Sequence, residues 1–283
     1  MVQPAFNIGD PDQALEVNDG HLLIEISAQS LNYILFKKDP NELLLLRQYR
    51  LYTTSDRSSR DLIEEVISED TLISQHADRA LIIYNFPESS IVPTECYTAE
   101  MNGPLTMLMY GEDNNECVFG EEVKDLHMHN VYRVPKNIHS LLKEKFTGSR
   151  YWHFYTMLLL SSDGDYLGKQ HVIKTVFYHD KFIAVFYSAE KLQLIQTFNY
   201  QTPEDVAYYL LLICKQFTVR QQEITLSVSG LIDSQSALYS ELLKYFPTVF
   251  EEKLPEGIEL KGLLEEFPAH YFSPLLKMSL CGL

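Results

Sequence analysis

The sequence predicts an α/β protein made of two related lobes, and three observations support this prediction. A strand–strand–strand–helix–strand pattern occurs twice along the chain, at a separation of roughly 150 residues. The length of 283 residues exceeds that of a usual single domain. The hydrophobic fraction of 46% is normal for a globular protein. We therefore expect a first lobe at residues 1–150 and a second lobe at residues 151–283.

The first copy of the pattern begins with alternating apolar and polar residues. Leu22, Ile24 and Ile26 share one face of a strand, and Glu25 lies on the other. Ser58 and Ser59 are candidate caps for the helix that follows the third strand. The elements predicted for this copy are two strands within His21–Lys38, a strand at Leu43–Arg47, a helix at Asp61–Ile67 and a strand at Leu81–Tyr84.

The second copy repeats the order, and its helix has a clear start. Thr202 is the expected N-cap, Pro203 occupies the first helical position, and Asp205 completes a capping box. The body of this helix, Val206–Cys214, is apolar almost all round, so we expect it to be covered on both sides. The elements predicted here are strands at Val172–Tyr178, Phe182–Tyr187, Leu192–Phe198 and Ile224–Val228, and a helix at Pro203–Phe217. The matched pairs are Phe36 with Phe186, Leu43 with Leu192, Leu45 with Leu194, Asp61 with Asp205, and Asn85 with Gly230.

The remaining segments give weaker patterns. Gly111–Glu122 is acidic and contains two glycines, so we expect an exposed loop. Tyr151–Leu160 fits either a strand or a buried helix. The other expectations are a strand at Val131–Val134, a helix at Pro135–Phe146 and a tail at Phe267–Leu283 that packs on the body.

The net charge of -16 restricts the partners of the chain. It opposes binding to nucleic acid and to an anionic membrane surface, and it leaves solubility or a basic protein partner as its consequences. Met1–Gln13 has no basic residue and no apolar stretch of the kind found in signal peptides, so we expect a cytoplasmic protein. The four cysteines lie far apart without a C-x-x-C pair, which suits a reducing compartment, and we expect them to fill the core.

Several local motifs resemble a known family. They are Asn199–Asp205, Tyr208–Tyr209, Gln216, Leu226–Gly230 and His270–Phe272. Together with the doubled pattern they resemble an uncharacterised family of Bacteroidetes proteins that has an actin-like ATPase fold, which is a duplicated ribonuclease H-like fold. The resemblance implies two lobes, each with a mixed five-stranded sheet flanked by helices. It implies no particular activity, because fold does not fix function.

The phosphate-binding turns of actin-like ATPases are degenerate in this chain. In that fold the turn between the first two strands of each lobe carries Asp and Gly, which hold Mg²⁺ and close on phosphate. The first turn here, Ala28–Asn32, has neither residue, and the second, Tyr178–Phe182, keeps only Asp180. The adenosine-side loop is reduced to Ser229 and Gly230, and Gly230 is also explained as the end of a strand. Asp180, Ser229 and Gly230 are therefore the candidate nucleotide-binding residues, and we expect no ATP hydrolysis.

Other candidate sites have simpler structural explanations. Asp163–Asp165 fits a turn between strands better than a metal or phosphate loop. His127 and His129 have a spacing that metals use, but no third ligand follows at a fixed distance, so we expect no metal site. The chain lacks the G-x-S-x-G, H-E-x-x-H, G-x-x-x-x-G-K and G-x-G-x-x-G motifs. The tyrosine-rich stretches Tyr49–Tyr52 and Tyr239–Phe246 fit either a protein interface or core packing.

These observations favour a non-catalytic, cytoplasmic pseudoenzyme with no cofactor that binds another protein. The alternative is a nucleotide-binding switch, in which a degenerate site between the lobes holds ATP with Mg²⁺. A third alternative is a subunit that assembles with copies of itself.

Overall fold

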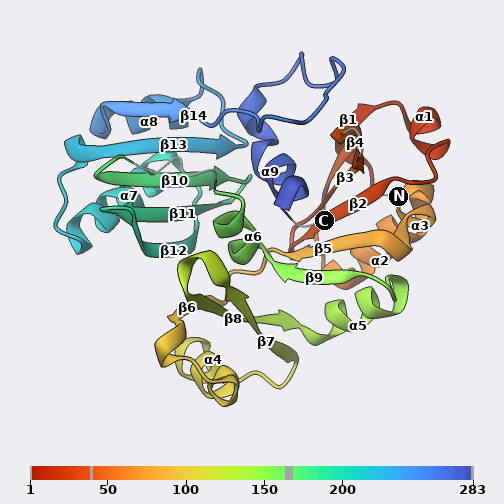
Figure 1. Cartoon of the computed structure of the whole chain (residues 1–283), viewed down its shortest axis with the longest axis horizontal. Coiled ribbons are helices and arrows are strands. Elements are labelled where there is room, and N and C mark those ends of the chain that lie inside the picture. The colour runs from red at the N-terminus through yellow and green to blue at the C-terminus, as the bar shows by residue number, and fades with distance from the viewer. Residues whose placement is uncertain (1, 39–40, 163–167, 282–283) are drawn as a thin grey trace. The chain divides into compact units, whose positions relative to one another are not determined.

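The computed structural model of the chain describes residues 2–38, 41–162 and 168–281 (Figure 1). The chain divides into two compact units. The first unit consists of residues up to Ser161, with 256–263 and the segment from Met278 onward. The second unit consists of residues 162–255 and 264–277.

The first unit contains a six-stranded sheet in the order β1-β4-β3-β2-β5-β9. Strands β2, β3 and β4 form an antiparallel meander, whereas β5 and β9 join in parallel. The predicted sheet has five strands, and the additional strand β1 pairs with the edge of β4. The elements of this sheet and its helices are β1 (Pro4–Gly9), α1 (Pro11–Leu15), β2 (His21–Ile26), β3 (Ser30–Lys38), β4 (Asn41–Arg50), α2 (Ser59–Glu69), α3 (Thr71–Gln75), η1 (Ala77–Arg79), β5 (Ala80–Tyr84), α5 (Lys136–Lys145), β9 (Arg150–His153) and α6 (Phe154–Leu160).

A smaller sheet of three strands, in the order β6-β8-β7, is inserted between β5 and α5. The prediction of an exposed loop at Gly111–Glu122 is wrong from residue 116 onward, because this part of the segment belongs to β7. The segment Tyr151–Leu160 contains both predicted alternatives, since β9 ends at His153 and α6 begins at Phe154. The elements of the insertion are β6 (Ser89–Pro93), η2 (Thr94–Cys96), η3 (Ala99–Met101), α4 (Asn102–Tyr110), β7 (Glu116–Val123), η4 (Lys124–Leu126) and β8 (Met128–Pro135).

The second unit contains a five-stranded sheet in the order β12-β11-β10-β13-β14, as predicted. Its first three strands are antiparallel, and β13 and β14 join in parallel. This order matches that of β4-β3-β2-β5-β9 in the first unit. The elements are β10 (His171–Phe177), β11 (Lys181–Ser188), β12 (Lys191–Asn199), α7 (Pro203–Gln216), η5 (Gln221–Glu223), β13 (Ile224–Gly230), α8 (Ala237–Tyr245), β14 (Thr248–Glu251), η6 (Ala269–Tyr271) and α9 (Ser273–Cys281).

The two sheets share a β-bulge at the same place. In the first unit Leu44 is the extra residue between the pairs Leu35–Leu45 and Phe36–Leu43. In the second unit Gln193 is the extra residue between Phe186–Leu194 and Tyr187–Leu192. Bulges bend a strand and increase its twist, so they are specific features of a sheet. The leucine pairs match as predicted, whereas Phe36 corresponds to Tyr187 and not to Phe186.

Side-chain caps start the crossover helix of each unit. Ser58 and Asp61 form a capping box at α2, and Thr202 and Asp205 form one at α7, where Pro203 is in the first turn. Asp61 and Asp205 thus have the same role, as predicted. A cap of this kind stabilises a helix by about 1 kcal/mol because it satisfies backbone N–H groups that lack an intrahelical partner.

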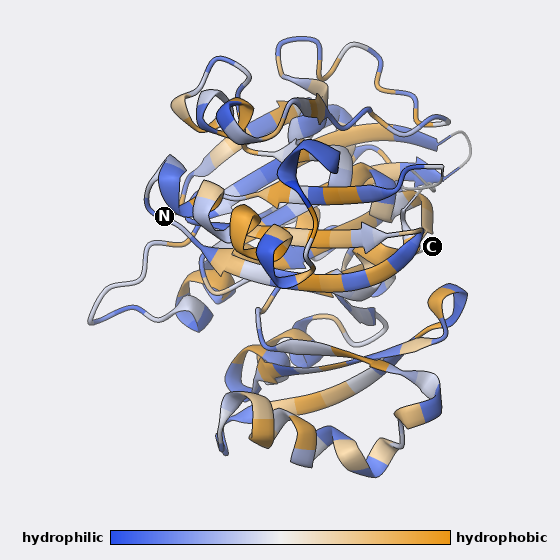
Figure 2. Ribbon diagram, turned by 90° about the vertical axis from the view of Figure 1, so that its left-hand side faces the viewer, coloured by the Kyte–Doolittle hydropathy of each residue, from blue (hydrophilic) through white to orange (hydrophobic). Residues whose placement is uncertain are grey.

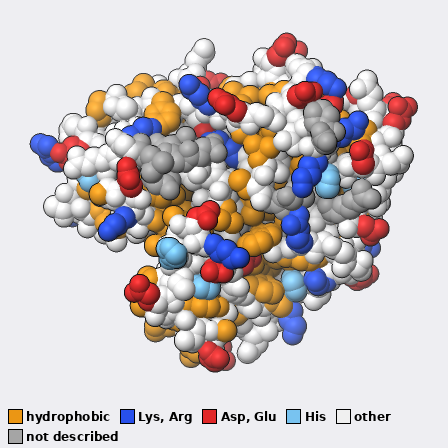
Figure 3. All heavy atoms as spheres, viewed as in Figure 1, with side chains coloured by type: hydrophobic (Ala, Val, Ile, Leu, Met, Phe, Trp, Pro, Cys, Tyr) orange, Lys and Arg blue, Asp and Glu red, His pale blue; other side chains and the backbone are white. Residues whose placement is uncertain are grey.

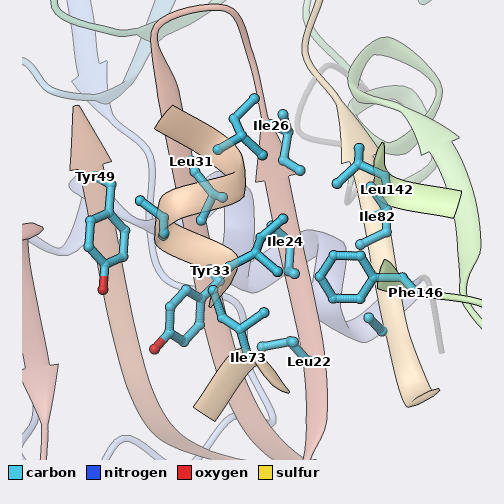
Figure 4. Close-up of a cluster of buried hydrophobic side chains, with 14 of the residues drawn as sticks. Leu22, Ile24, Ile26, Leu31, Tyr33, Tyr49, Ile73, Ile82, Leu142 and Phe146 are labelled. Carbon is cyan, nitrogen blue, oxygen red and sulfur yellow. The ribbon is translucent and has the colours of Figure 1, made fainter. Parts of the chain in front are cut away.

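The core of the first unit is formed by side chains of β2, β3, β4 and β5 that pack against α2, α3 and α5 (Figure 4). Leu22, Ile24 and Leu31 are fully buried there. The core of the second unit lies between its sheet and the helices α7 and α8. In Figure 2 the strands that are visible carry hydrophobic residues (orange) along much of their length.

The expectation that α7 is covered all round is wrong. Val206, Leu210 and Ile213 are buried, but Tyr208 is 61% exposed and Leu212 is 41% exposed. One face of α7 therefore packs on the sheet, and the opposite face is open to solvent.

Candidate functional site

The candidate residues of the second unit lie at one edge of its sheet. β10 and β13 are parallel neighbours, and Phe177 at the end of β10 pairs with Gly230 at the end of β13. Asp180 belongs to the turn that follows β10. Because the carboxyl ends of parallel strands meet at the same edge, the structure brings the turn of Asp180 and the pair Ser229–Gly230 to one side of the unit.

Gly230 has a structural role at this edge. Its φ is +76°, and a Cβ atom there would lie 2.2 Å from the carbonyl oxygen of Phe177. The next residue, Leu231, donates its backbone N–H to the same oxygen at 2.8 Å. Only glycine combines a positive φ with so close an approach between two strands. The glycine is therefore explained by strand packing.

The hydroxyl of Ser229 is also engaged within the sheet. Ser229 is buried, and its Oγ donates to the carbonyl oxygen of Thr175 at 2.9 Å. Thr175 in turn donates its Oγ1 to the carbonyl oxygen of Ser227 at 2.9 Å. These bonds connect β10 to β13, so Ser229 could donate its hydroxyl to a ligand only by breaking its bond to Thr175.

Asp180 is the remaining candidate at this edge. Its side chain is half-buried, and its backbone oxygen accepts the N–H of Tyr200 at 2.9 Å. Burial and the nearby charge of Asp180 raise the pKa of Tyr200 to about 12. Among the residues that the structure describes, no hydrogen-bond donor to the Asp180 carboxylate is found. The carboxylate is thus the one candidate group that is available to a ligand.

The equivalent turn of the first unit binds its own backbone. Ser27 Oγ accepts the backbone N–H groups of Gln29 at 3.2 Å and Ser30 at 3.0 Å. Ser59 donates its Oγ to the carbonyl oxygen of Ala28 at 2.7 Å. In an actin-like ATPase such N–H groups face phosphate. Here a buried serine hydroxyl occupies them.

Comparisons with known proteins identify the family. The model of the family described as "Protein of unknown function (DUF3822)" matches residues 11–249. The chain belongs to the DUF3822 family. A search of curated proteins found no match.

Solved structures show the fold of this DUF3822 protein. A protein of unknown function with an actin-like ATPase fold from Bacteroides thetaiotaomicron is 20% identical, with a TM-score of 0.75 over 84% of this chain and 92% of that one. A chain of the PilM–PilN type IV pilus biogenesis complex is 10% identical, with a TM-score of 0.59 over 93% of this chain and 98% of that one. The DUF3822 protein therefore has an actin-like ATPase fold, as its local motifs predict.

A polar network in the first unit was missed by sequence reasoning. The Glu121 carboxylate accepts the backbone N–H of His153, at 3.1 Å to Oε1 and 3.0 Å to Oε2, and the hydroxyl of Tyr132. Burial raises the pKa of Glu121, and the hydrogen bonds from Tyr132, Thr156 and His153 oppose that rise. The network joins β7 and β8 of the small sheet to β9 of the large one.

His153 is not available as a base in this network. Its Nε2 lies 2.9 Å from the carbonyl oxygen of Phe86, which can only accept a hydrogen bond. Its Nδ1 accepts the backbone N–H of Tyr155 at 3.1 Å. The two contacts define a neutral imidazole whose proton is on Nε2. Because both ring nitrogens are bonded, the DUF3822 network fits a structural role better than general acid–base catalysis.

The candidate metal residues do not form a cluster. His127 lies in a turn with φ of 51°, and His129 stacks on Tyr97 with ring centroids 3.8 Å apart. Within the described ranges, no three His, Cys, Asp or Glu side chains are grouped so that they could hold a metal ion. Asp163–Asp165 lies outside the described residues.

Two buried ion clusters stabilise the DUF3822 fold. In the first unit, Asp70 Oδ2 accepts hydrogen bonds from Tyr33 Oη at 2.8 Å, Tyr49 Oη at 2.8 Å and Arg47 Nη1 at 2.9 Å. Burial and the negative charge of Asp70 raise the pKa of both tyrosines. Tyr49 is therefore part of the core, and of the stretch Tyr49–Tyr52 only Tyr52, at 66%, is strongly exposed.

The second cluster surrounds Glu252 in the second unit. Its Oε1 lies 3.2 Å from Lys174 Nζ and 3.1 Å from Lys277 Nζ, and its Oε2 accepts the hydroxyl of Ser273 at 2.8 Å. Burial alone would raise the pKa of Glu252, but the two lysine charges and the serine hydroxyl outweigh it and lower this pKa. The cluster joins β10, the end of β14 and α9.

The cysteines only partly fill the core. Cys214 is buried, whereas Cys96 and Cys281 are exposed, so the expectation of core packing is wrong for these two. All four are free. No helix in the described part of the chain is long and apolar enough to cross a membrane.

Proposed function

We propose that this DUF3822 protein is a non-catalytic, cytoplasmic protein that uses its actin-like fold to bind another protein. The turn at Ser27–Ser30 carries this proposal. The backbone N–H groups that would face phosphate are bonded to the hydroxyl of Ser27. A nucleotide would have to break these hydrogen bonds, so the free energy gained from phosphate binding would be smaller.

Further observations support protein binding. The PilM–PilN complex shows that a protein with this fold is found in a complex with another protein. The matched strand order and the matched bulges support descent from a duplicated ancestral unit, in which the binding surface changed while the fold was kept. The four cysteines form no disulfide bond, which suits a reducing compartment.

The test is affinity capture from a native lysate of the source organism after crosslinking, with mass spectrometry of the recovered proteins. The proposal expects a partner that is recovered in a constant ratio to the bait and that copurifies when it is expressed with the bait. The proposal is rejected if no partner is recovered above the level obtained with an unrelated acidic bait and the protein is a monomer in sedimentation.

A second candidate function is a nucleotide-binding switch. It is favoured by the turn of Asp180, whose available carboxylate lies at the same sheet edge as Gly230. Titration calorimetry with ATP, GTP and ADP in the presence of Mg²⁺ tests it. The proposal of a non-catalytic binding protein expects no heat at millimolar nucleotide, whereas an affinity that is lost in Asp180→Ala would establish the switch.

A further inference from the structure

The helix α4 exposes apolar side chains on its solvent side. Leu108 is 81% exposed, Met107 is 59% exposed and Met109 is 57% exposed. No charged residue occurs between Asn102 and Tyr110, and Thr106 is the buried residue of the helix. Surface helices usually place charged or polar residues on the outer face. A contiguous apolar surface of this kind marks a site of interaction with another protein.

The exposed side chains are not needed to hold α4 in place. Tyr110 donates its hydroxyl to the carbonyl oxygen of Ser89 at 2.8 Å. Arg133 donates Nη1 to the carbonyl oxygen of Gly111 at 2.8 Å and Nη2 to that of Tyr110 at 3.1 Å. These bonds anchor the C-terminal end of α4 to the small sheet. The outer residues can therefore be changed without removing the contacts that fix the helix.

The chain segment that contains α4 is strongly acidic. The segment 87–126 contains nine acidic residues and one basic residue, Lys124, so its net charge of -8 is half of the total of -16. The six exposed acidic residues of the segment are Glu95, Glu100, Glu112, Asp113, Glu122 and Asp125. In the space-filling view, hydrophobic and acidic side chains lie next to each other over α4 (Figure 3).

Two of these acids follow the C-terminal end of the helix. Glu112 and Asp113 come directly after the C-cap residue Gly111. The helix dipole already places negative partial charge at that end, so the two carboxylates add to it instead of compensating it. Arg133 brings one positive charge to this end, but it also pairs with Glu88, so the charge around the end of α4 remains negative and favours a cationic partner.

The negative charge of the segment around α4 indicates which kind of partner its apolar surface binds. A second copy would bring an equally acidic segment against the first, and an anionic lipid surface would be repelled in the same way. A basic segment would be attracted. Methionine side chains are flexible and polarizable, so they adapt to a helix packed against them. An amphipathic helix with basic residues beside its apolar stripe matches both the apolar and the acidic parts of the surface.

We infer that α4 and its flanking acidic residues form the docking surface for a basic amphipathic helix of a partner protein. This inference rests on the proposed function, because it names the surface and the class of partner. Leu108, Met107 and Met109 contact the apolar stripe of the partner helix. Glu112 and Asp113 pair with its lysine or arginine residues.

The test measures fluorescence anisotropy of a labelled helical peptide of about 18 residues that consists of Leu and Lys at amphipathic spacing. A second peptide has the same leucines and Glu in place of Lys. The variants are Leu108→Ser and the double variant Glu112→Lys/Asp113→Lys. Matched controls in the second unit are Leu243→Ser, which changes a leucine that is 51% exposed on α8, and Glu265→Lys/Glu266→Lys, which reverses two exposed neighbouring acids.

We expect wild-type protein to bind the Leu/Lys peptide and not the Leu/Glu peptide. Each α4 variant should weaken binding by about tenfold or more, because exposed apolar anchors and their paired charges dominate such contacts. The two control variants should bind as the wild type does. All variants should have unchanged circular dichroism spectra, since the changed side chains are exposed.

Three results would overturn the inference. They are no binding of the Leu/Lys peptide, equal weakening by the α4 and control variants, and self-association of the wild type that Leu108→Ser abolishes. The last result would assign the surface to a second copy. If the cellular partner found by capture is still recovered with both α4 variants, the docking surface is wrong while the proposed function stands. If no partner is captured by the wild type, the proposed function itself fails.

Discussion

The substitution Gly230→Ala separates a structural role of this glycine from a role in nucleotide binding. The new Cβ would lie 2.2 Å from the Phe177 carbonyl oxygen and 2.8 Å from the Phe177 nitrogen, at a φ of +76°. Both contacts are with backbone atoms of β10. The end of β13 must therefore move away from β10.

The expected loss of stability follows from two contributions. The positive φ costs an alanine roughly 1 kcal/mol relative to glycine. Separation of the strands also breaks the bond from Leu231 N–H to Phe177 O, which leaves buried groups without partners at a cost of about 2 kcal/mol. We expect a total of about 3 kcal/mol in the free energy of unfolding of the second unit. Gly168→Ala is the matched control in the same unit, because Gly168 has a φ of +72° and nothing within 4 Å of its added Cβ, so only the conformational cost of about 1 kcal/mol applies.

The assay is urea denaturation followed by circular dichroism, together with hydrogen exchange at the Leu231 amide. The amide should exchange faster in Gly230→Ala than in Gly168→Ala. Equal destabilisation by the two variants would refute the packing explanation. So would a Gly230→Ala protein that has wild-type stability and has lost an affinity for ADP that the wild type possesses.

Three further predictions concern buried charges. Asp70→Ala removes the carboxylate that pairs with Arg47 and should lower the free energy of unfolding by about 4 kcal/mol, whereas Asp61→Ala, which removes an exposed capping contact, should have a clearly smaller effect in the same denaturation assay. The pKa of Glu252 is lowered from its ordinary value of 4.5. The stabilisation by its ionised carboxylate is therefore complete above pH 4.5 and is lost as the pH falls through the lowered pKa. A Glu252→Gln protein should lack this part of the acid transition in thermal melts recorded over a series of pH values. The pKa of Glu116 is raised to about 7 by burial and nearby carboxylates. The folded state therefore binds the proton more tightly than the unfolded state, and the stability should decrease as the pH rises from 4.5 to about 7. Glu116→Gln should abolish this decrease, and a wild-type melting temperature that is constant over this pH range would contradict the prediction.

The main sheets could be predicted because local and long-range signals agree in them. The capping box at Thr202–Asp205 and the candidate cap Ser58 marked where helices begin, and the structure confirms both, with Asp61 completing a second capping box. The apolar runs of β2 and β3 identified buried strands. Such segments are informative because the residues that favour the element locally are also the residues that the core requires.

In the small sheet, the predicted strand Val131–Val134 is part of β8, whereas β7 escaped prediction because its inward face carries an acid. Phe119 and Glu121 point to the same side of β7, and the Glu121 carboxylate is satisfied by the backbone N–H of His153. That partner lies in another element, so sequence alone suggested a solvent-exposed loop. Glu25 is a similar case, because it is buried and accepts hydrogen bonds from the amides of Asn32 and Asn85.

The candidate site was predicted in position but not in chemistry. Sequence placed Asp180 and Gly230 near each other, and the structure shows them at one sheet edge. The sequence could not show that the backbone of Gly230 packs closely against Phe177, or that the Ser27 hydroxyl accepts hydrogen bonds from the N–H groups of the first turn. These contacts depend on the distance between backbones of different strands. The exposed surface of α4 was missed for the same reason, since an apolar helix is expected to be buried until its neighbours are known.

Affinity capture with wild-type and Asp180→Ala baits, each with and without millimolar Mg-ATP, tests the proposed function most directly. We expect the same partner in all four samples, because binding does not depend on nucleotide. No partner in any sample, or a partner that appears only with ATP and is lost in Asp180→Ala, would contradict the proposal.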